Sequence, residues 1–537
     1  MSTQLRPGPA AAPRALAARL LTEAPRPARV RDWPHAHWLA VAAVCLGAFM
    51  GQLDASITTL AFPALERDFG SSPAGVEWVA LSYLLVLVSL LTPVGRLSDA
   101  LGRKALYLWG FVVFTATSAA CGLAGTLWLL VAMRAVQAVG AASMQANSVA
   151  LVSTAMPHGR IRAGLGVQAA AQALGLALGP TLGGLLVQGA GWRWVFWVNV
   201  PVGVIALVAG YYLLPRTRTR DGAPVAPAGS AERRLSRPGQ DPSGFDLRGL
   251  LLLACCTTAL LLALSAASGL PLPGWAVGAL VAAGAGAGAA LRRHALRVPH
   301  PIVDPRLLRA PGVGAGLAAG VLGYLVLFCP LVLVPQALDR RGVSASSSGL
   351  LLTALPAAFA LAATAGGALL PRGWADAARA RAGALVALAG AAGLCAATAA
   401  GAPDVLLLPG LAAAGWGLGL LLPANNALVM RAIPAEHAGA AGGLVNMTRG
   451  LGTSLGVALP ALGVHLAGAG RGVPAVFAVL AMLALAAAGL ARAGRGGGTG
   501  VGRASADQAG AGQAGARQAG AGRPGGGQPR RETQSRS

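Results

Sequence analysis

Long apolar stretches alternate with short polar stretches between residues 38 and 492. A helix needs about 20 apolar residues to cross the hydrocarbon core of a membrane. The pattern therefore predicts an all-α polytopic membrane protein. We expect fourteen spans, over residues 38–62, 76–95, 104–123, 126–153, 164–188, 193–214, 247–267, 272–291, 312–335, 347–370, 382–400, 404–430, 439–466 and 473–492.

The composition agrees with a membrane protein. Of the 537 residues, 55% are hydrophobic and 11% are charged, whereas soluble domains carry about 25% charged residues. The net charge of +24 would also suit a protein that binds nucleic acid. The basic residues lie between the apolar stretches and in the tails, however, rather than on one compact face. We therefore expect membrane lipids and no nucleic acid as partners.

The basic residues are unevenly distributed between the two sides of the predicted membrane. The N-terminus, the even-numbered loops and the C-terminus carry 35 of them, and the odd-numbered loops carry five. Lysine and arginine gather on the cytoplasmic side of membrane proteins. We therefore expect a multi-pass protein of the cell (cytoplasmic) membrane with both termini in the cytoplasm. The two remaining arginines, Arg134 and Arg449, lie inside predicted helices.

An internal repeat relates the two parts of the chain at one offset of 277 residues. Spans one to six then correspond to spans nine to fourteen, and spans seven and eight form an inserted pair. Repeated helical bundles around a central site are typical of secondary transporters. The offset pairs Asp99 with Asp376, Lys104 with Arg381, Gly140 with Gly417, Pro157 with Pro434, Gly166 with Gly443, Gly175 with Gly452, and Gly179 with Gly456.

The repeat and the polar segments together predict how the chain is divided. Two six-helix bundles enclose the inserted pair, and polar segments of low complexity are expected to be disordered. The predicted regions are a cytoplasmic extension (1–37), a first bundle (38–214), a basic cytoplasmic linker (215–245), the inserted pair (246–291), a cytoplasmic loop (292–311), a second bundle (312–492) and a low-complexity tail (493–537).

A carboxylate lies deep within the first apolar stretch, where FMGQLDASITTLAFPAL contains Asp54. Ionisable groups at such depth are costly and usually mark a pathway or relay. A rise of 1.5 Å per residue places Asp54 and Arg134 within about 6 Å of each other in depth. Because arginine keeps its proton, Asp54 would be the group that titrates. A static ion pair, or a cap near the outer mouth, is the alternative.

The segment GRLSDALGRK lies between the second and third spans. Its glycines permit a tight turn, and its charges can hold or release a neighbouring helix end. We expect a gate clamp here, with an ordinary positively charged loop as the alternative. The repeat partner PRGWADAARAR keeps the acid and one base but loses the glycines. The clamp residues are Gly95, Arg96, Asp99, Gly102, Arg103, Lys104, Asp376 and Arg381.

Small residues recur once per helical turn in the segment GLALGPTLGG of the fifth span. They let another helix approach closely, and a proline adds a kink. The residues concerned are Gly175, Gly179, Pro180, Gly183 and Gly184. Polar residues elsewhere in the spans are candidates for a substrate cavity, and some of them are expected to join helices instead. They are Gln137, Asn147, Gln168, Gln172, Asn425, Asn426, Asn446 and Arg449.

Taken together, these segments resemble the major facilitator superfamily, and within it the fourteen-spanner drug:proton antiporters of the EmrB/QacA type. The resemblance extends over residues 38–492 and rests on LDASITTLAFPAL, GRLSDALGRK, RAVQAVGAA, GLALGPTLGG, GWRWVFWVNVPVG and GLVNMTRGLGTSLGVAL. It implies the major facilitator fold with two pseudo-symmetric halves. It also implies that GLALGPTLGG is an antiporter signature linked to export, and it supports a coupling role for Asp54.

The resemblance implies a proton-coupled efflux transporter that exports hydrophobic or amphipathic compounds, such as drugs or antibiotics, by alternating access. The histidines and cysteines show no spacing suited to a metal or an enzyme, and no GxxxxGK[ST] loop is present. We therefore expect no enzyme activity and no cofactor, with the proton gradient as the energy source and a monomeric protein. The alternatives are an exporter of one endogenous metabolite and a non-transporting receptor or scaffold.

The deep charges also predict a preference among substrates. The predicted spans contain two deep arginines, Arg134 and Arg449, and one deep carboxylate, Asp54. The membrane interior of the protein therefore carries about one positive charge when Asp54 is ionised and about two when it is protonated. A dication gains little in such surroundings. We expect neutral, weakly basic or anionic amphipathic substrates.

Overall fold

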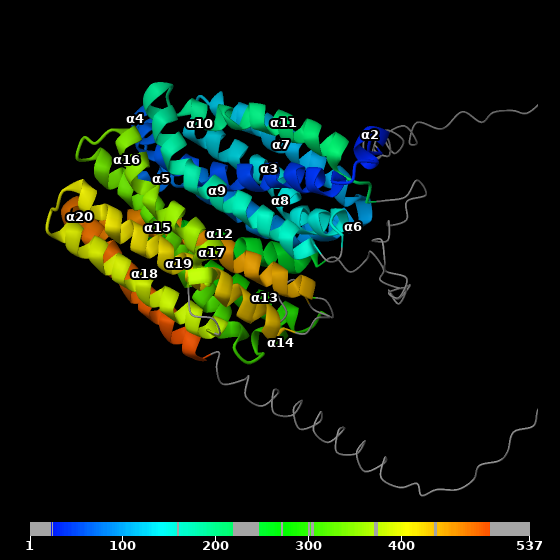
Figure 1. Cartoon of the computed structure of the whole chain (residues 1–537). Helices are drawn as coiled ribbons and strands as arrows, with labels where there is room; N and C mark the ends of the chain where they lie inside the picture. The colour runs from blue at the N-terminus through cyan, green and yellow to red at the C-terminus, as the bar shows by residue number, and fades with distance from the viewer. Residues whose placement is uncertain are drawn as a thin grey trace, which may run out of the picture.

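The structure is a computed structural model that describes residues 25–157, 160–217, 246–269, 272–298, 305–369, 374–433 and 438–493, together with Glu23 and Pro301. Among these residues, fourteen helices are long and apolar enough to cross a membrane. Figure 1 shows two groups of long helices, with the first half of the chain in blue and cyan above the second half in yellow and orange. The predicted all-helical fold with fourteen spans is confirmed.

The first half begins with a bent span that is longer than the predicted 38–62. Helix α3 (Ala36–Ile57) passes through the 3-10 turn η1 (Thr58–Ala61) into α4 (Phe62–Phe69). Pro63 lies in the first turn of α4, where its missing N–H leaves no bond unmade. The other elements of this half are α5 (Pro73–Val76), α6 (Trp78–Leu101), α7 (Arg103–Gly122), α8 (Leu127–Ala155), α9 (Ile161–Gly189), α10 (Arg193–Trp197) and α11 (Asn199–Leu213).

The second half ends in α20 (Ala438–Ala493), which contains two spans. They meet at Gly468, whose positive φ of 74° suits glycine and reverses the chain. The other elements of this half are α15 (Val313–Asp339), α16 (Ala345–Leu352), α17 (Ala354–Leu369), α18 (Asp376–Ala399), η4 (Asp404–Leu406) and α19 (Leu407–Ala432). Two short helices lie outside the bundles, α2 (Ala28–Arg31) and α14 (Pro305–Leu308).

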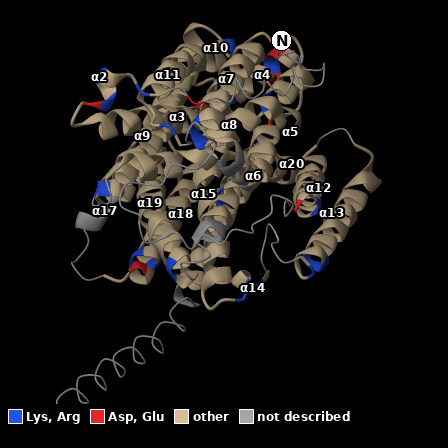
Figure 2. Cartoon of the chain, turned by 90° about the vertical axis from the view of Figure 1, so that its right-hand side faces the viewer, with Lys and Arg blue, Asp and Glu red and all other residues tan. Residues whose placement is uncertain are grey.

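The inserted pair consists of α12 (Leu247–Ala267) and α13 (Gly274–Ala295). The two helices pack against each other, and α12 also contacts α6 and α20. Figure 2 shows the pair at the edge of the bundles. Asp246 joins its two members, because Oδ1 accepts the N–H of Gly249 at 2.7 Å and lies 2.5 Å from His294 Nε2 on α13.

The sequence repeat has a counterpart in the helix packing. Glycines on α8 and α9 pack against the backbones of α7 and α3, and their repeat partners on α19 and α20 pack against α18 and α15. A side chain at these positions would overlap the facing backbone, so the repeat preserves equivalent close contacts in the two halves. The approaches are Gly140 to Phe114, Gly417 to Ala387, Gly175 to Phe49, and Gly452 to Val321.

The two ends of the bundles differ in which chain segments they contain. The N-terminal end is the end at which α3 begins, on the right in Figure 1, and the opposite end is where α4 and α16 lie. The halves are joined at the opposite end by polar contacts that we call the closed junction. These are Arg67–Asp339 at 2.7 Å, Gln188–Ser346 at 3.1 Å and Thr181–Thr353 at 2.6 Å.

Some predicted regions lie wholly or mostly outside the described residues. They are the extension (1–37) except for its last part, the linker (215–245) and the tail (493–537). The proposed boundaries of the regions stay predictions.

Candidate functional site

Asp54 on α3 and Arg134 on α8 form a buried ion pair. Arg134 Nη1 lies 2.7 Å from Asp54 Oδ2, and the two side chains are 1% and 0% exposed. Opposite charges are tolerated in such surroundings when they are paired and fully hydrogen-bonded. The structure thus brings the two residues of similar predicted depth into direct contact.

Two amide side chains satisfy the second oxygen of Asp54. Asn199 Nδ2 on α11 donates to Oδ1 at 2.8 Å, and Gln137 Nε2 on α8 approaches the same oxygen at 3.4 Å. Gln137 Oε1 also accepts from Arg134 Nη1 at 2.7 Å. Donors therefore reach both carboxylate oxygens. Asn199 was missed by the sequence analysis, although a lone asparagine in the apolar segment VFWVNVPVG was a usable signal.

An aromatic ring links Arg134 to the space between the halves. The guanidinium carbon lies 4.3 Å from the ring centroid of Tyr83, and Nε donates to the carbonyl of Val79 at 3.1 Å. A cation over an aromatic face is attracted by the ring quadrupole. Tyr83 also lines the central cavity, so one side chain touches both the ion pair and the cavity.

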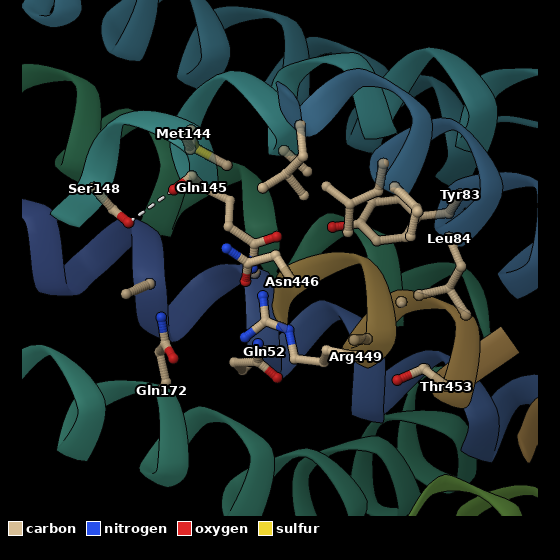
Figure 3. A pocket seen from close by; sticks show the side chains of 18 of the residues that line it. Gln52, Tyr83, Leu84, Met144, Gln145, Ser148, Gln172, Asn446, Arg449 and Thr453 are labelled. Carbon is tan, nitrogen blue, oxygen red and sulfur yellow. Dashed lines mark hydrogen bonds between the residues drawn. The ribbon is translucent and has the colours of Figure 1, made fainter. Parts of the chain in front are cut away.

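The central cavity lies between the halves, and Figure 3 shows side chains of both reaching into it. The first half contributes residues of α3, α6, α8 and α9, and the second half contributes residues of α15 and α20. Apolar side chains such as Leu84, Met144 and Phe328 form much of the wall. A largely apolar wall with a few polar groups suits an amphipathic small molecule. The polar lining residues are Gln52, Tyr83, Gln145, Ser148, Gln172, Asn446, Arg449 and Thr453.

Arg449 is the one charged side chain in the cavity lining among the described residues, and that lining contains no carboxylate. In Figure 3 the Arg449 side chain lies beside Gln52 and Asn446. Asp54 does not line the cavity, and its charge is balanced by Arg134. The cavity therefore carries a net positive charge.

The structure places three of the eight predicted cavity residues in the lining, namely Gln172, Asn446 and Arg449. The other five do not line this cavity, and their assignment to a substrate cavity stays a prediction; they are Gln137, Asn147, Gln168, Asn425 and Asn426. An amide in a membrane helix can join helices as well as line a cavity, and the sequence does not separate the two uses.

Two of these five residues use their amides in hydrogen bonds to backbone carbonyls. Asn425 Nδ2 on α19 donates to the carbonyl of Gly316 on α15 at 2.8 Å, and so joins two helices. Asn147 Nδ2 donates to the carbonyl of Ser143 one turn earlier in α8 at 2.8 Å.

The GRLSDALGRK segment connects α6 to α7. Gly95 lies within α6, and Gly102, with a φ of 103°, makes the turn. Lys104 is buried, and its Nζ donates to the carbonyls of Tyr211 and Leu214 at the end of α11, at 2.9 and 2.8 Å. Lys104 thus ties α7 to α11 within the first half. The side chains of Arg96 and Asp99 lie outside the described part of the structure, and the clamp stays a prediction.

The repeat partners of the clamp lie within the second half. Asp376 begins α18 and forms an ion pair with Arg431 near the end of α19. Arg381, one turn further along α18, lines a separate hollow beside Trp374. The described contacts of Asp376 therefore join two helices of one bundle.

The GLALGPTLGG segment packs against both halves of the protein. Gly175, Gly179 and Gly183 face α3, where their nearest neighbours include Phe49, Ser56 and Ile57. On the second half, Gly184 approaches the backbone of Ala345, and the carbonyl of Pro180 approaches Gly349 on α16. The small residues thus position the ion-pair helix α3 and also contribute to contact between the halves.

Glu77 is a second fully buried carboxyl group, with 0% exposure directly before α6. Asp54 is therefore not the only fully buried acid among the described residues, although Glu77 lies near the start of its span rather than deep within it. Glu77 stands at the edge of an apolar stretch, a position where a sequence pattern suggests contact with water. The packing of α5, α6 and α20 covers it.

Two six-helix bundles around a shared cavity define a membrane transporter fold. The chain belongs to the Major Facilitator Superfamily, whose family model matches residues 44–457. The predicted resemblance is thus confirmed, and the chain is a multi-pass membrane transporter.

Known proteins agree with this classification. The tetracenomycin C resistance and export protein of Streptomyces glaucescens is 32% identical over 445 residues, which cover 82% of this chain and 77% of that protein. The riboflavin transporter RibZ of Clostridioides difficile (strain 630) is 28% identical over 424 residues, which cover 78% of this chain and 87% of that protein. A crystal structure of an auto-inhibited POT family peptide transporter shares the fold, with a TM-score of 0.60 at 18% identity over 85% of this chain and 97% of that one.

Proposed function

We propose that the protein is a proton-coupled efflux transporter that exports hydrophobic or amphipathic compounds, such as drugs or antibiotics, by alternating access. The observation that carries the proposal is the buried pair of Asp54 and Arg134, which touches the cavity through Tyr83. The similarity to a resistance and export protein for tetracenomycin C supports the export class.

The proton enters the proposal through the ion pair. In the present arrangement, three donors stabilise Asp54 as a carboxylate. A movement of α3 relative to α8 would separate it from Arg134 and leave a buried charge without its partner. Protonation of Asp54 then relieves that cost, because a neutral acid tolerates burial far better than a carboxylate. Pairing and protonation of Asp54 would thus alternate, with the proton gradient as energy source and no cofactor.

The direction of transport follows from a proposed orientation. The predicted excess of basic residues places the N-terminal end of the bundles and both termini in the cytoplasm, within the cell (cytoplasmic) membrane. The closed junction then faces outward, and we infer that this state is the one that admits substrate from the cytoplasm. Substrate would enter the cavity from that side. We propose a monomer in contact with lipid as the working unit, and no enzyme activity.

The cavity lining favours a class of substrate. Arg449 is its one charged member among the described residues, and the apolar wall suits an amphipathic body. A dication would meet a like charge without a carboxylate to balance it, which is unfavourable at close range. The proposal therefore names neutral, weakly basic or anionic amphipathic compounds.

A second candidate function is export of one specific compound, such as an endogenous metabolite. The similarity to a riboflavin transporter favours it, because that protein's name states a single substrate. A panel of drugs and dyes distinguishes the two, since a specific exporter moves one member and a broad exporter moves many. A cavity lined by both halves argues against the third candidate, a receptor or scaffold that transports nothing.

Inverted membrane vesicles test the proton coupling. We expect a proton gradient to drive uptake of a monovalent dye into vesicles with the wild-type protein, and a protonophore to abolish it. Asp54→Asn should abolish gradient-driven uptake while the protein stays inserted. Full gradient-driven uptake by this variant would contradict the proposal.

A matched control separates coupling from stability in this experiment. Asp54→Asn leaves Arg134 buried without a counter-charge, which costs about 3–5 kcal/mol in other proteins. The double variant Asp54→Asn/Arg134→Gln removes both charges and should recover the amount of folded protein. It should remain unable to couple uptake to the gradient.

A further inference from the structure

Glu77 lies where the two halves of the protein meet. It precedes α6 of the first half, and α5 and α6 both pack against α20 of the second half. The backbone of Ala461 on α20 approaches the carboxyl group, but neither Oε1 nor Oε2 reaches hydrogen-bond geometry with a described group. The side chain also makes no capping bond to α6. Glu77 is therefore covered by the second half without being paired to it.

Among the described residues, no cation is close enough to act on Glu77, although Arg67 and Arg340 act on the neighbouring Glu66. Its closest charged or titratable neighbours on the elements around it are another acid and a thiol, Glu66 on α4 and Cys329 on α15. On α20, His465 lies one turn beyond Ala461 and is exposed, and its ring lies next to Gly269. On α12 the titratable residues are Arg248, Cys255 and Cys256, all in the part nearer its beginning, and α5 has none.

These surroundings determine the state of the carboxyl group. A buried carboxylate without a donor or counter-charge is far less stable than the neutral acid, so closure over Glu77 favours the bound proton. Separation of the halves at this end would admit water, which stabilises the carboxylate and lets the proton leave. Closure and proton binding are thus linked. Each closure of the halves over an ionised Glu77 therefore takes up one proton from the solution at the opposite end.

We propose that Glu77 is a second proton-binding site, distinct from Asp54, whose proton is required for the halves to close at the opposite end of the bundles. The step is the reversible addition of one proton to the carboxylate of Glu77 when α20 packs against α5 and α6. This inference rests on the alternating access of the proposed function. In the proposed orientation, the proton comes from the outside, so an acidic exterior would favour return of the transporter to the state seen here.

Distances across the opposite end test the proposal without any transport measurement. Leu123 in the first half and Val405 in the second are 71% and 60% exposed, and neither is one of the junction residues. Spin labels are attached at Leu123→Cys and Val405→Cys in the full chain without its native cysteines, in lipid nanodiscs. Electron paramagnetic resonance then gives the ratio of closed to open molecules as a function of pH. The measurement is made with Asp54→Asn/Arg134→Gln, so that titration of Asp54 does not contribute and no unpaired charge stays buried.

We expect the closed-to-open ratio to rise as the pH falls, by up to about tenfold per pH unit for a single proton. With Glu77→Gln added, which resembles the neutral acid, the ratio should be high and independent of pH. If that variant is not recovered as folded protein, Glu77→Ala takes its place, and the closed-to-open ratio should again be independent of pH. Asp68→Asn is the matched control, because it removes an exposed carboxylate at the same end and should leave the pH dependence unchanged.

Three results would overturn the assignment. One is a ratio that does not change with pH while Glu77 is present. Another is an unchanged pH dependence in Glu77→Gln or Glu77→Ala. A third is loss of the dependence in Glu66→Gln instead, which would assign the proton to the neighbouring acid. Because substrate is absent, failure here leaves proton-coupled efflux through Asp54 untouched, and a failure of efflux leaves this result standing.

Discussion

The guanidinium of Arg134 lies 4.3 Å from the ring centroid of Tyr83, and the Tyr83 side chain lines the central cavity. A substrate in the cavity therefore reaches the buried ion pair through a single side chain. This contact could couple substrate binding to the ion pair. A substrate that displaces the Tyr83 ring changes the surroundings of Arg134 and so the strength of its ion pair with Asp54.

Tyr83 should therefore be needed for coupling more than for binding. Tyr83→Leu removes a cation–π contact of about 0.5–2 kcal/mol. It also removes the aromatic ring that separates the cavity from the ion pair of Asp54 and Arg134. We expect substrate to release fewer protons from the purified Tyr83→Leu variant than from the wild-type protein. A pH-sensitive dye in weak buffer measures this release. Tyr83→Phe keeps the ring and should behave like the wild type. Equal proton release by Tyr83→Leu and the wild type would exclude this route.

Asn199 should stabilise the protein through Asp54. It donates to Oδ1 at 2.8 Å, and Asn199→Leu leaves that oxygen only the longer contact with Gln137. Loss of a buried hydrogen bond to a charged group costs about 1–3 kcal/mol, so the midpoint of thermal unfolding in detergent should fall. Asn147→Leu is the control. That buried amide bonds a carbonyl of its own helix, and its removal should have a smaller effect.

The fold could be predicted from the sequence because its main determinants are local. The apolar stretches are long enough to span a membrane, and the repeat of 277 residues places the same small residues at equivalent helix contacts. Gly140 and Gly417 illustrate this, since each faces the backbone of the neighbouring helix. Such information is present in the order of the residues alone.

The site could be predicted only in part, because it depends on which helix faces which. Depth along two helices suggested that Asp54 and Arg134 lie near each other, but depth says nothing about rotation around a helix axis. The amides show the consequence, since Gln172 lines the cavity whereas Asn425 bonds a carbonyl of another helix. Glu77 was missed because a helix of the other half covers it, and no local pattern records that contact.

The close contact of α9 with α3 gives a stability prediction. A methyl group at Gly175 would overlap the backbone carbonyl of Phe49, which cannot move aside as a flexible side chain can. Overpacking of this kind typically costs about 1–3 kcal/mol. Gly175→Ala should therefore lower the thermal unfolding midpoint. In the same helix, a methyl at Gly166 meets no atom within 4 Å, and Gly166→Ala should leave the midpoint unchanged or raise it slightly.

The charge of the cavity predicts how the protein selects among cations. Arg449 is the one charged side chain in the described lining, and no carboxylate there balances it. Two like charges 4 Å apart repel by roughly 1–4 kcal/mol, depending on how well water screens them. A dication meets this repulsion twice over, once for each of its charges. We therefore expect the wild-type protein to export a monovalent dye faster than a divalent analogue of similar size.

Substitution of Arg449 tests the cause of that preference. Arg449→Gln keeps a polar side chain of similar reach and removes the charge, so the ratio of divalent to monovalent export should rise by at least about fivefold, equivalent to 1 kcal/mol. Arg471→Gln is the matched control, because it removes an exposed arginine from the same helix and should leave the ratio unchanged. Paired efflux assays in cells that express each variant give the ratio directly. Faster export of the dication by the wild type, or an unchanged ratio in Arg449→Gln, would show that the charge of this arginine does not select the substrate.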